Sequence, residues 1–213
     1  MTDSSILTIG SILAIDTTVA TLAEAEHLLL GLGQAVVLPE ECWVATHEIR
    51  DSNPHYAFSI TLTGGTEKDL HGAVEAFCHG DYADGAGLVL SDGADGRSSD
   101  GLDQARDEAT RRHAGRVVRF PGQQSVRGEL ALGTVRERSP IARFPVLGGG
   151  IPDDDTVLVT RDFLRPRWDS GVLTLAVLPA GPGRVAPFEV PDPTPCCGEH
   201  TPAFVARRQA GPS

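Results

Sequence analysis

The centre of the predicted fold is the stretch Ala83-Asp84-Gly85-Ala86-Gly87-Leu88-Val89-Leu90-Ser91-Asp92-Gly93. It begins as an acidic, glycine-rich turn, continues as a short apolar strand and ends at a second turn signal, Ser91-Asp92-Gly93. Gly85 and Gly87 lack a Cβ and therefore allow another backbone to come close. The stretch is typical of a strand packed in the middle of a layered domain built from helices and strands.

The segment on the N-terminal side predicts a strand, a helix and a second strand. Residues 6–15 are apolar and β-branched, and residues 21–32 place leucines on one helical face before Gly33 ends the helix. Residues 34–39 then read as a short apolar strand. A connection of two residues between helix and strand is typical of a parallel sheet.

Two more elements lead into the central stretch. Alternating large apolar residues at 56–62 predict a strand, whereas residues 42–53 show no assignable pattern. Thr66 is placed to cap a helix that has Leu70, Val74 and Phe77 on one face.

The segment on the C-terminal side repeats the pattern of helix and strand. A charged helix over about residues 101–113 and a strand at 116–120 follow the polar loop after Asp92. Leu130, Leu132 and Val135 are spaced to face a core from a helix. Strands at 156–160 and 172–178 predict an antiparallel, hairpin-like pair.

We therefore expect an α/β (or α+β) fold in which helices cover a mixed sheet. A single domain occupies residues 1–180, and residues 181–213 form a Pro-rich extended tail. Its prolines are Pro182, Pro187, Pro191, Pro193, Pro195 and Pro202.

The composition excludes several classes of protein. The chain has 213 residues, 40% of them hydrophobic, which indicates a folded globular protein. A formal net charge of −11 argues against nucleic acid as the main partner, because phosphate binding needs a basic face. The acidic N-terminus resembles no signal peptide and no apolar run reaches the length of a membrane span, so we expect a cytoplasmic protein with its four cysteines reduced.

Two groups of cysteine and histidine residues are candidates for chemistry. Cys196, Cys197 and His200 offer two thiolates and an imidazole, which suit zinc, but adjacent cysteines reach one tetrahedral ion only with strain. Cys78 and His79 would form a nucleophile and base only if their side chains faced each other, which neighbours on one backbone seldom do. The alternatives are an exposed tail segment and a helix-terminal histidine beside a half-buried cysteine. We therefore assign no catalytic, metal-binding or cofactor-binding residue.

Acidic and glycine-rich loops give no clearer signal. Aspartates gather at residues 81–100 and 153–155, but neither group has the spacing of a calcium loop, which favours solvated turn residues. The glycines at 148–150 are not followed by the Lys-Ser/Thr pair of a phosphate-binding loop. No Gly-x-Ser-x-Gly segment is present, and no cofactor is predicted.

Three segments together resemble the thiolase-type ketoacyl synthases, which include chalcone-synthase-like and polyketide members. Residues 22–41 (LAEAEHLLLGLGQAVVLPEE) are similar to the family's long helix behind its nucleophile and the strand that follows. Residues 83–90 resemble its "GDGAGA-V-V-L" strand entry. Residues 128–133, with the strands at 156–160 and 172–178, look like its closing "GH-x-x-G" turn and last two strands. The resemblance spans about residues 6–180 and implies a layered, thiolase-like half.

The same resemblance implies that condensation chemistry is missing. The family places a cysteine at the start of its first helix, where the helix N-terminus and nearby histidines stabilise a thiolate. Residues 15–18 (Ile-Asp-Thr-Thr) contain no cysteine, and Glu129 stands where the family has its closing histidine. A chain of half the length without the cysteine is similar to the chain length factors, which work by pairing with a competent synthase.

The function that the resemblance implies is a non-condensing partner subunit in polyketide or fatty-acid-type biosynthesis. Its partner would be a ketosynthase or another protein subunit, in a homo- or hetero-oligomer, with exposed apolar area at the first helix or a sheet edge. One alternative is a small metal-dependent enzyme that uses Cys196, Cys197 and His200 with Cys78 or His79. Another is an acidic binding or immunity-type protein that occupies a basic partner, since the chain is strongly acidic.

Overall fold

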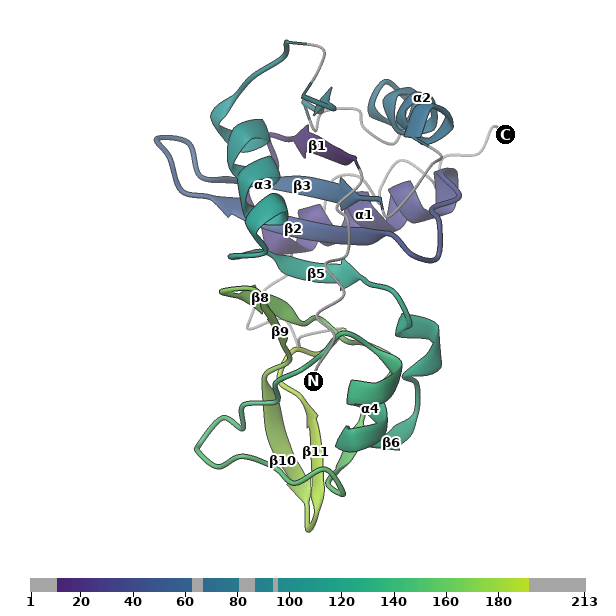
Figure 1. Cartoon of the computed structure of the whole chain (residues 1–213). Coiled ribbons are helices and arrows are strands. Elements are labelled where there is room, and N and C mark those ends of the chain that lie inside the picture. The colour runs from purple at the N-terminus through teal and green to yellow at the C-terminus, as the bar shows by residue number, and fades with distance from the viewer. Residues whose placement is uncertain (1–10, 63–66, 81–86, 94–95, 192–213) are drawn as a thin grey trace, which may run out of the picture.

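The computed structural model describes residues 11–62, 67–80, 87–93 and 96–191, which form an α+β fold with two sheets (Figure 1). The larger sheet contains, in spatial order, β4 (Val89–Ser91), β1 (Ile12–Asp16), β3 (His55–Thr61), β2 (Trp43–Ile49), β5 (Arg116–Arg119), β8 (Arg167–Asp169) and β9 (Val172–Thr174). The smaller sheet contains β10 (Val177–Gly181), β11 (Arg184–Pro187), β7 (Val157–Val159) and β6 (Glu129–Ala131). The helices of the described residues are α1 (Leu22–Ala35), α2 (Glu67–Cys78), α3 (Asp100–Arg111) and α4 (Leu132–Arg138).

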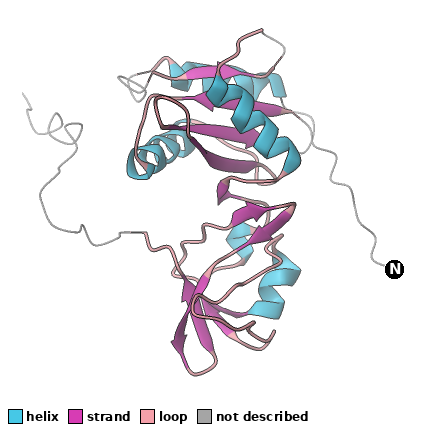
Figure 2. Ribbon diagram, turned by 90° about the vertical axis from the view of Figure 1, so that its left-hand side faces the viewer, coloured by secondary structure: helices cyan, strands magenta, loops and turns pink. Residues whose placement is uncertain are grey.

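Helices cover both faces of the larger sheet (Figures 1 and 2). α3 packs over β1, β2 and β3, where small side chains such as Ala14 and Ala57 meet Leu102 and Ala105. α1 and α2 pack on the opposite face against larger apolar side chains. This second cluster includes Leu13, Ile15, Leu28, Leu32, Val44, Phe58, Ile60, Leu70, Val74 and Phe77. The prediction that one face of the second helix is buried is therefore confirmed.

The helix termini follow local sequence rules. Thr21 caps α1: its hydroxyl accepts from the Glu24 N–H while the Glu24 carboxylate accepts from the Thr21 N–H, which is a complete capping box. The Ser99 hydroxyl caps α3 by accepting from the Leu102 N–H, without a reciprocal bond. Arg112 ends α3 in the left-handed conformation.

The larger sheet is antiparallel at every named strand pair, so the expected parallel unit is wrong. Its second strand in the chain is β2, within residues 42–53, which had no assignable pattern. Thr46 and His47 are both buried in β2 and both hydrogen-bonded, and polar side chains on a strand buried on two faces hide its apolar pattern.

Residues 34–39 form no strand, although their burial alternates as a strand's would. Val36 and Leu38 are buried while Val37 is 97% exposed. Val36 closes α1 through its N–H to the Leu32 carbonyl, and the carbonyls of Leu38 and Pro39 accept from the Arg119 side chain. The backbone is thus satisfied without a neighbouring strand.

The central stretch of the prediction lies at the edge of the sheet, not in its middle. Residues 89–91 form β4, which pairs only with β1 in the described chain. Gly87 has φ +56°, and a Cβ there would lie 2.6 Å from the Thr18 side chain. The close approach of the Gly87 backbone to the Thr18 side chain therefore requires glycine at position 87. Residues 81–86, which include Gly85, lie outside the described part of the chain.

The predicted hairpin of residues 156–160 and 172–178 is also wrong. β7 lies in the smaller sheet, and β9 pairs with β8, which had been expected to be a polar connection. Ser170 and Gly171 link β8 to β9, both with positive φ, as a two-residue hairpin turn requires. Leu132 and Val135 are buried in α4 as expected, but Leu130 lies on β6.

The smaller sheet extends the fold past the expected domain boundary. β11 falls inside residues 181–213, the range predicted as an extended tail, and pairs with both β10 and β7. One apolar cluster joins the two sheets, since Trp43, Ala45 and Val117 share it with Leu158 and Val185. No helix among the described residues is both long and apolar enough to cross a membrane.

Candidate functional site

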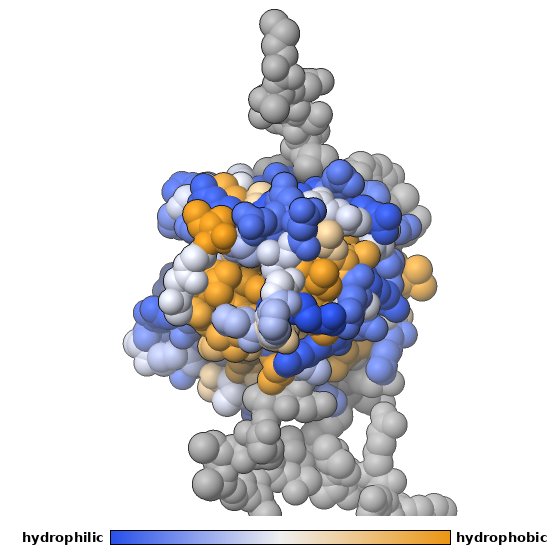
Figure 3. Space-filling view, turned by 90° about the horizontal axis from the view of Figure 1, so that it is seen from below, coloured by the Kyte–Doolittle hydropathy of each residue, from blue (hydrophilic) through white to orange (hydrophobic). Residues whose placement is uncertain are grey.

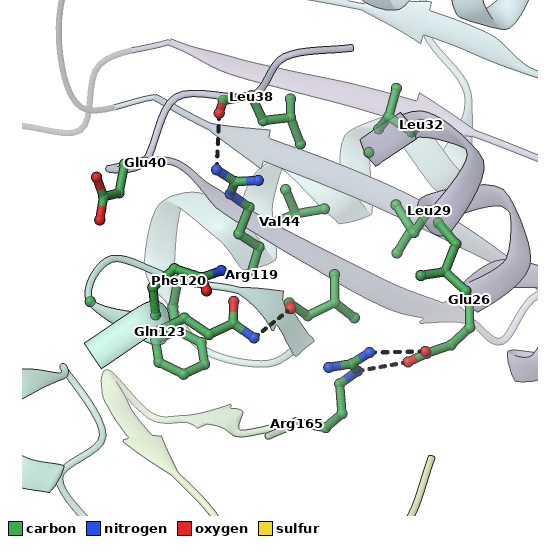
Figure 4. Close-up of a pocket in the computed structure, with 15 residues that line it drawn as sticks. Glu26, Leu29, Leu32, Leu38, Glu40, Val44, Arg119, Phe120, Gln123 and Arg165 are labelled. Atoms are coloured by element: carbon green, nitrogen blue, oxygen red, sulfur yellow. Dashed lines mark hydrogen bonds and ion pairs between the residues drawn. The ribbon is translucent and has the colours of Figure 1, made fainter. Parts of the chain in front are cut away.

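A hollow with a volume of about 200 Å³ lies beside α1 (Figure 4). We call it the α1 groove. Its lining residues are Glu26, Leu29, Leu30, Leu32, Gly33, Leu38, Glu40, Val44, Val118, Arg119, Phe120, Gly122, Gln123, Gln124 and Arg165. Leucine, valine and phenylalanine side chains form the apolar floor, and glutamate, arginine and glutamine side chains line it with them.

One wall of the groove is a single face of α1. Glu26, Leu29, Leu30 and Gly33 follow the spacing i, i+3, i+4, i+7, which aligns them along the helix. Leu28 and Leu32 are buried against the sheet. The amphipathic pattern that predicts α1 therefore leaves a second, partly exposed apolar stripe on the groove side.

The opposite wall is built by the chain that leaves β5. The Arg119 Nη2 donates to the carbonyls of Leu38 and Pro39 at 2.9 and 3.1 Å, which fixes the segment after α1 (Figure 4). Gln123 donates to the Val118 carbonyl at 3.3 Å. Gly122 has φ +76°, and a Cβ there would collide with the Arg138 carbonyl, so the tight turn beneath the groove requires glycine.

An ion-pair network closes one end of the groove. Arg165 reaches the Glu26 carboxylate with two bonds of 2.9 and 3.1 Å. The buried Arg116 contacts the same carboxylate and also Glu189, at 2.6 Å. Burial alone would raise the pKa of Glu26, but Arg165 and Arg116 together hold it below its ordinary value. The two carboxylates and the two guanidinium groups neutralise one another, and their contacts hold α1 to the rest of the fold.

The other end of the groove is open and acidic. Glu40 is exposed and forms no ion pair with any described residue. Among the other lining residues Leu30, on α1, is 59% exposed, and Val37 is almost wholly exposed on the segment that leads to Glu40. The lining contains no histidine, cysteine or serine, so its chemistry is that of binding: an apolar floor next to one free carboxylate.

A second area of exposed apolar side chains lies at the end of the molecule formed by the smaller sheet (Figure 3). Hydrophilic side chains divide it, as the alternation of orange and blue shows. The exposed large apolar residues of this part are Leu147, Ile151, Leu178 and Phe188.

Cys78 and His79 do not form a catalytic pair. Cys78 is buried at the end of α2, where burial and then the nearby Glu75 raise its pKa to about 11, so the thiol stays protonated at neutral pH. His79 is exposed. The histidine at the end of the helix is as expected, whereas the cysteine beside it is buried and not half-buried.

The other predicted positions are either surface residues or outside the described part. Cys196, Cys197 and His200 lie outside the described residues, as does Asp84. Within the described chain, no group of three histidine, cysteine, aspartate or glutamate side chains is placed to hold a metal ion. Glu129 and Asp154 form surface ion pairs with Arg184 and Arg136.

Sequence reasoning anticipated exposed apolar area at the first helix but not the α1 groove itself. The groove joins α1 to residues 118–124, and only the fold brings these together. The second apolar stripe of α1 was the available signal. In comparisons with protein-family models, curated proteins and solved structures, no match to this chain was found.

Proposed function

We propose that this protein is a non-condensing partner subunit that binds another protein through the α1 groove. The observation that carries the proposal is the exposed stripe of α1, where Leu29 and Leu30 border an apolar hollow of about 200 Å³. That volume suits one or two anchoring side chains of a partner better than a whole cofactor, since ligand pockets usually exceed about 300 Å³.

The groove also defines the chemistry of the partner. An apolar anchor such as leucine or phenylalanine would fill the floor, and a lysine or arginine beside it would meet Glu40. The chain's net charge of −11 favours such a partner at long range. A ketosynthase-type enzyme is the partner class that the sequence resemblance implies. The thiolase-like relationship belongs to this proposal, and helices on both faces of one sheet are compatible with it.

The proposal is tested with the ketosynthases encoded in the source genome, each purified and titrated against this protein. We expect a complex whose Kd rises about 30-fold in Leu30→Asp, as for the loss of a residue central to an interface. Glu40→Lys should slow association and reduce its salt dependence.

The matched control is Ile151→Asp, which places the same charge at an exposed apolar residue away from the groove. This variant should bind as the wild type does. Equal weakening by Leu30→Asp and Ile151→Asp, or no complex with any of these synthases, would contradict the proposal.

A further inference from the structure

The buried His47 and Ser59 and the partly buried Glu108 form a hydrogen-bonded chain between β2, β3 and α3. The His47 Nδ1 lies 2.6 Å from the Glu108 Oε2, and the His47 Nε2 lies 2.8 Å from the Ser59 Oγ. His47 and Ser59 are 1% and 2% exposed. This is the order of contacts, carboxylate to imidazole to hydroxyl, that activates a serine as a nucleophile.

The surroundings fix the imidazole in the required form. Gln104 donates to the second Glu108 oxygen at 2.8 Å. Burial alone would raise the pKa of Glu108, but the hydrogen bonds from His47 and Gln104 bring it below its ordinary value, so Glu108 is a carboxylate. The Nδ1 of His47 therefore donates to Glu108, and in the neutral tautomer with this proton the Nε2 is the acceptor that faces the Ser59 hydroxyl. Position 115 must be glycine to make room for the His47 imidazole, because a Cβ there would lie 2.8 Å from the His47 Cε1.

Ser59 lines a small pocket that also contains one unpaired donor. Trp43, Arg112 and Trp168 line this pocket with it. The Trp43 Nε1 is buried and has no hydrogen-bond partner in the described structure. Buried donors are nearly always paired, so an unpaired one on a residue that lines the same pocket as Ser59 indicates a place for an acceptor oxygen.

Arg112 closes the pocket. Its guanidinium lies over the rings of Trp43 and Trp168, 5.6 and 5.2 Å from their centroids, and pairs with no carboxylate of the described chain. The enclosed space is about 10 Å³, enough for one water. Because no ion pair holds Arg112, its partly exposed side chain can leave the rings and enlarge the space beside Ser59.

We propose that Ser59, His47 and Glu108 form an acyl-transfer site for esters of small carboxylic acids. Ser59 Oγ bonds to the carbonyl carbon while its proton passes to the His47 Nε2, and the Trp43 N–H donates to the carbonyl oxygen as it becomes negative. The ester C–O bond then breaks, and the alcohol leaves with the proton from His47. Water reverses these steps on the acyl-serine and releases the acid.

This activity does not depend on the α1 groove or on the proposed partner. Its site lies on the α3 face of the sheet, whereas the groove lies beside α1 on the other face. Failure of one proposal therefore leaves the other in place.

The test uses p-nitrophenyl acetate with the full chain, and follows p-nitrophenol release and the site of acetylation by mass spectrometry. We expect a burst of one p-nitrophenol per chain and one acetyl group on the peptide that contains Ser59. Arg112→Ala should acetylate at least about ten-fold faster, because the pocket is then open. Ser59→Ala and His47→Gln should lose at least about 100-fold in rate.

Ser91→Ala is the control, since Ser91 is equally buried in the same sheet but far from His47 in the strand order. It should react as the wild type does. The proposal is overturned if folded wild-type protein and Arg112→Ala both stay unacetylated at Ser59, or if Ser59→Ala keeps the burst. The first of these outcomes requires no substitution of Ser59, His47 or Glu108. The proposal can therefore be refuted even if Ser59→Ala does not fold.

Discussion

At the scale of single residues, His55 links the pH of the solution to the stability of the fold. Its Nδ1 faces the Asn53 carbonyl at 2.7 Å and its Nε2 faces the Asp16 carboxylate at 2.9 Å, with Asp51 at 3.9 Å. Burial lowers the pKa of His55, but these acceptors raise it by more than burial lowers it. The pKa of His55 therefore lies above its ordinary value. Two acceptors on two ring nitrogens favour the imidazolium, which has two donors.

The sign of the pH dependence follows from this raised pKa. The stability that protonated His55 contributes is fully present below its unfolded pKa of about 6.5 and is lost as the pH rises through the higher folded value. We therefore expect the difference in free energy of unfolding between wild type and His55→Gln to shrink as the pH rises above about 6.5. Urea unfolding at several pH values measures this difference. The exposed His79→Gln should show a difference near zero throughout, and a constant difference for His55→Gln would refute the linkage.

At the scale of elements, alanine substitution at two helical glycines should change the stability of the protein in opposite directions. Gly72 in α2 has no atom within 4 Å of where a Cβ would stand, so Gly72→Ala should stabilise the protein by about 0.5–1 kcal/mol. A Cβ at Gly101 in α3 would collide with the Asp16 carboxylate, which is itself held by Ser99 and His55. Gly101→Ala should therefore cost about 1–3 kcal/mol. Thermal unfolding of both variants decides, and a stabilised Gly101→Ala would mean that α3 shifts freely on the sheet.

The same elements show what the sequence could predict. α1 and α3 were predictable because the pattern of residue types that favours a helix acts within a few positions, although the caps Thr21 and Ser99 were not predicted. β2 was not, because Thr46 and His47 are buried for reasons that lie on other elements: the Arg116 carbonyl, Glu108 and Ser59. The strand partners were equally hidden, since local pattern does not say that β3 pairs between β1 and β2. Both candidate sites join distant elements, so neither could be assembled from local sequence.

At the scale of the whole molecule, the two sheets share one core and should unfold together. Trp43 on β2 and Trp168 on β8 lie at the junction, with ring centroids 5.1 Å apart, so their fluorescence reports whether the two sheets stay joined. We expect urea transitions followed by tryptophan fluorescence and by far-UV circular dichroism to coincide, as for a two-state domain. A fluorescence transition that clearly precedes the loss of secondary structure would show two separable units.

The strand order also determines when the fold can form during synthesis. The chain makes β1 to β5 of the larger sheet, then β6 and β7 of the smaller one, then returns with β8 and β9 to the larger, and finishes the smaller with β10 and β11. Neither sheet is complete until its last strands leave the ribosome, at residues 174 and 187. This protein therefore cannot complete one sheet before it begins the other as it is synthesised from the N-terminus. A nascent chain stalled after β7 carries two unfinished sheet edges.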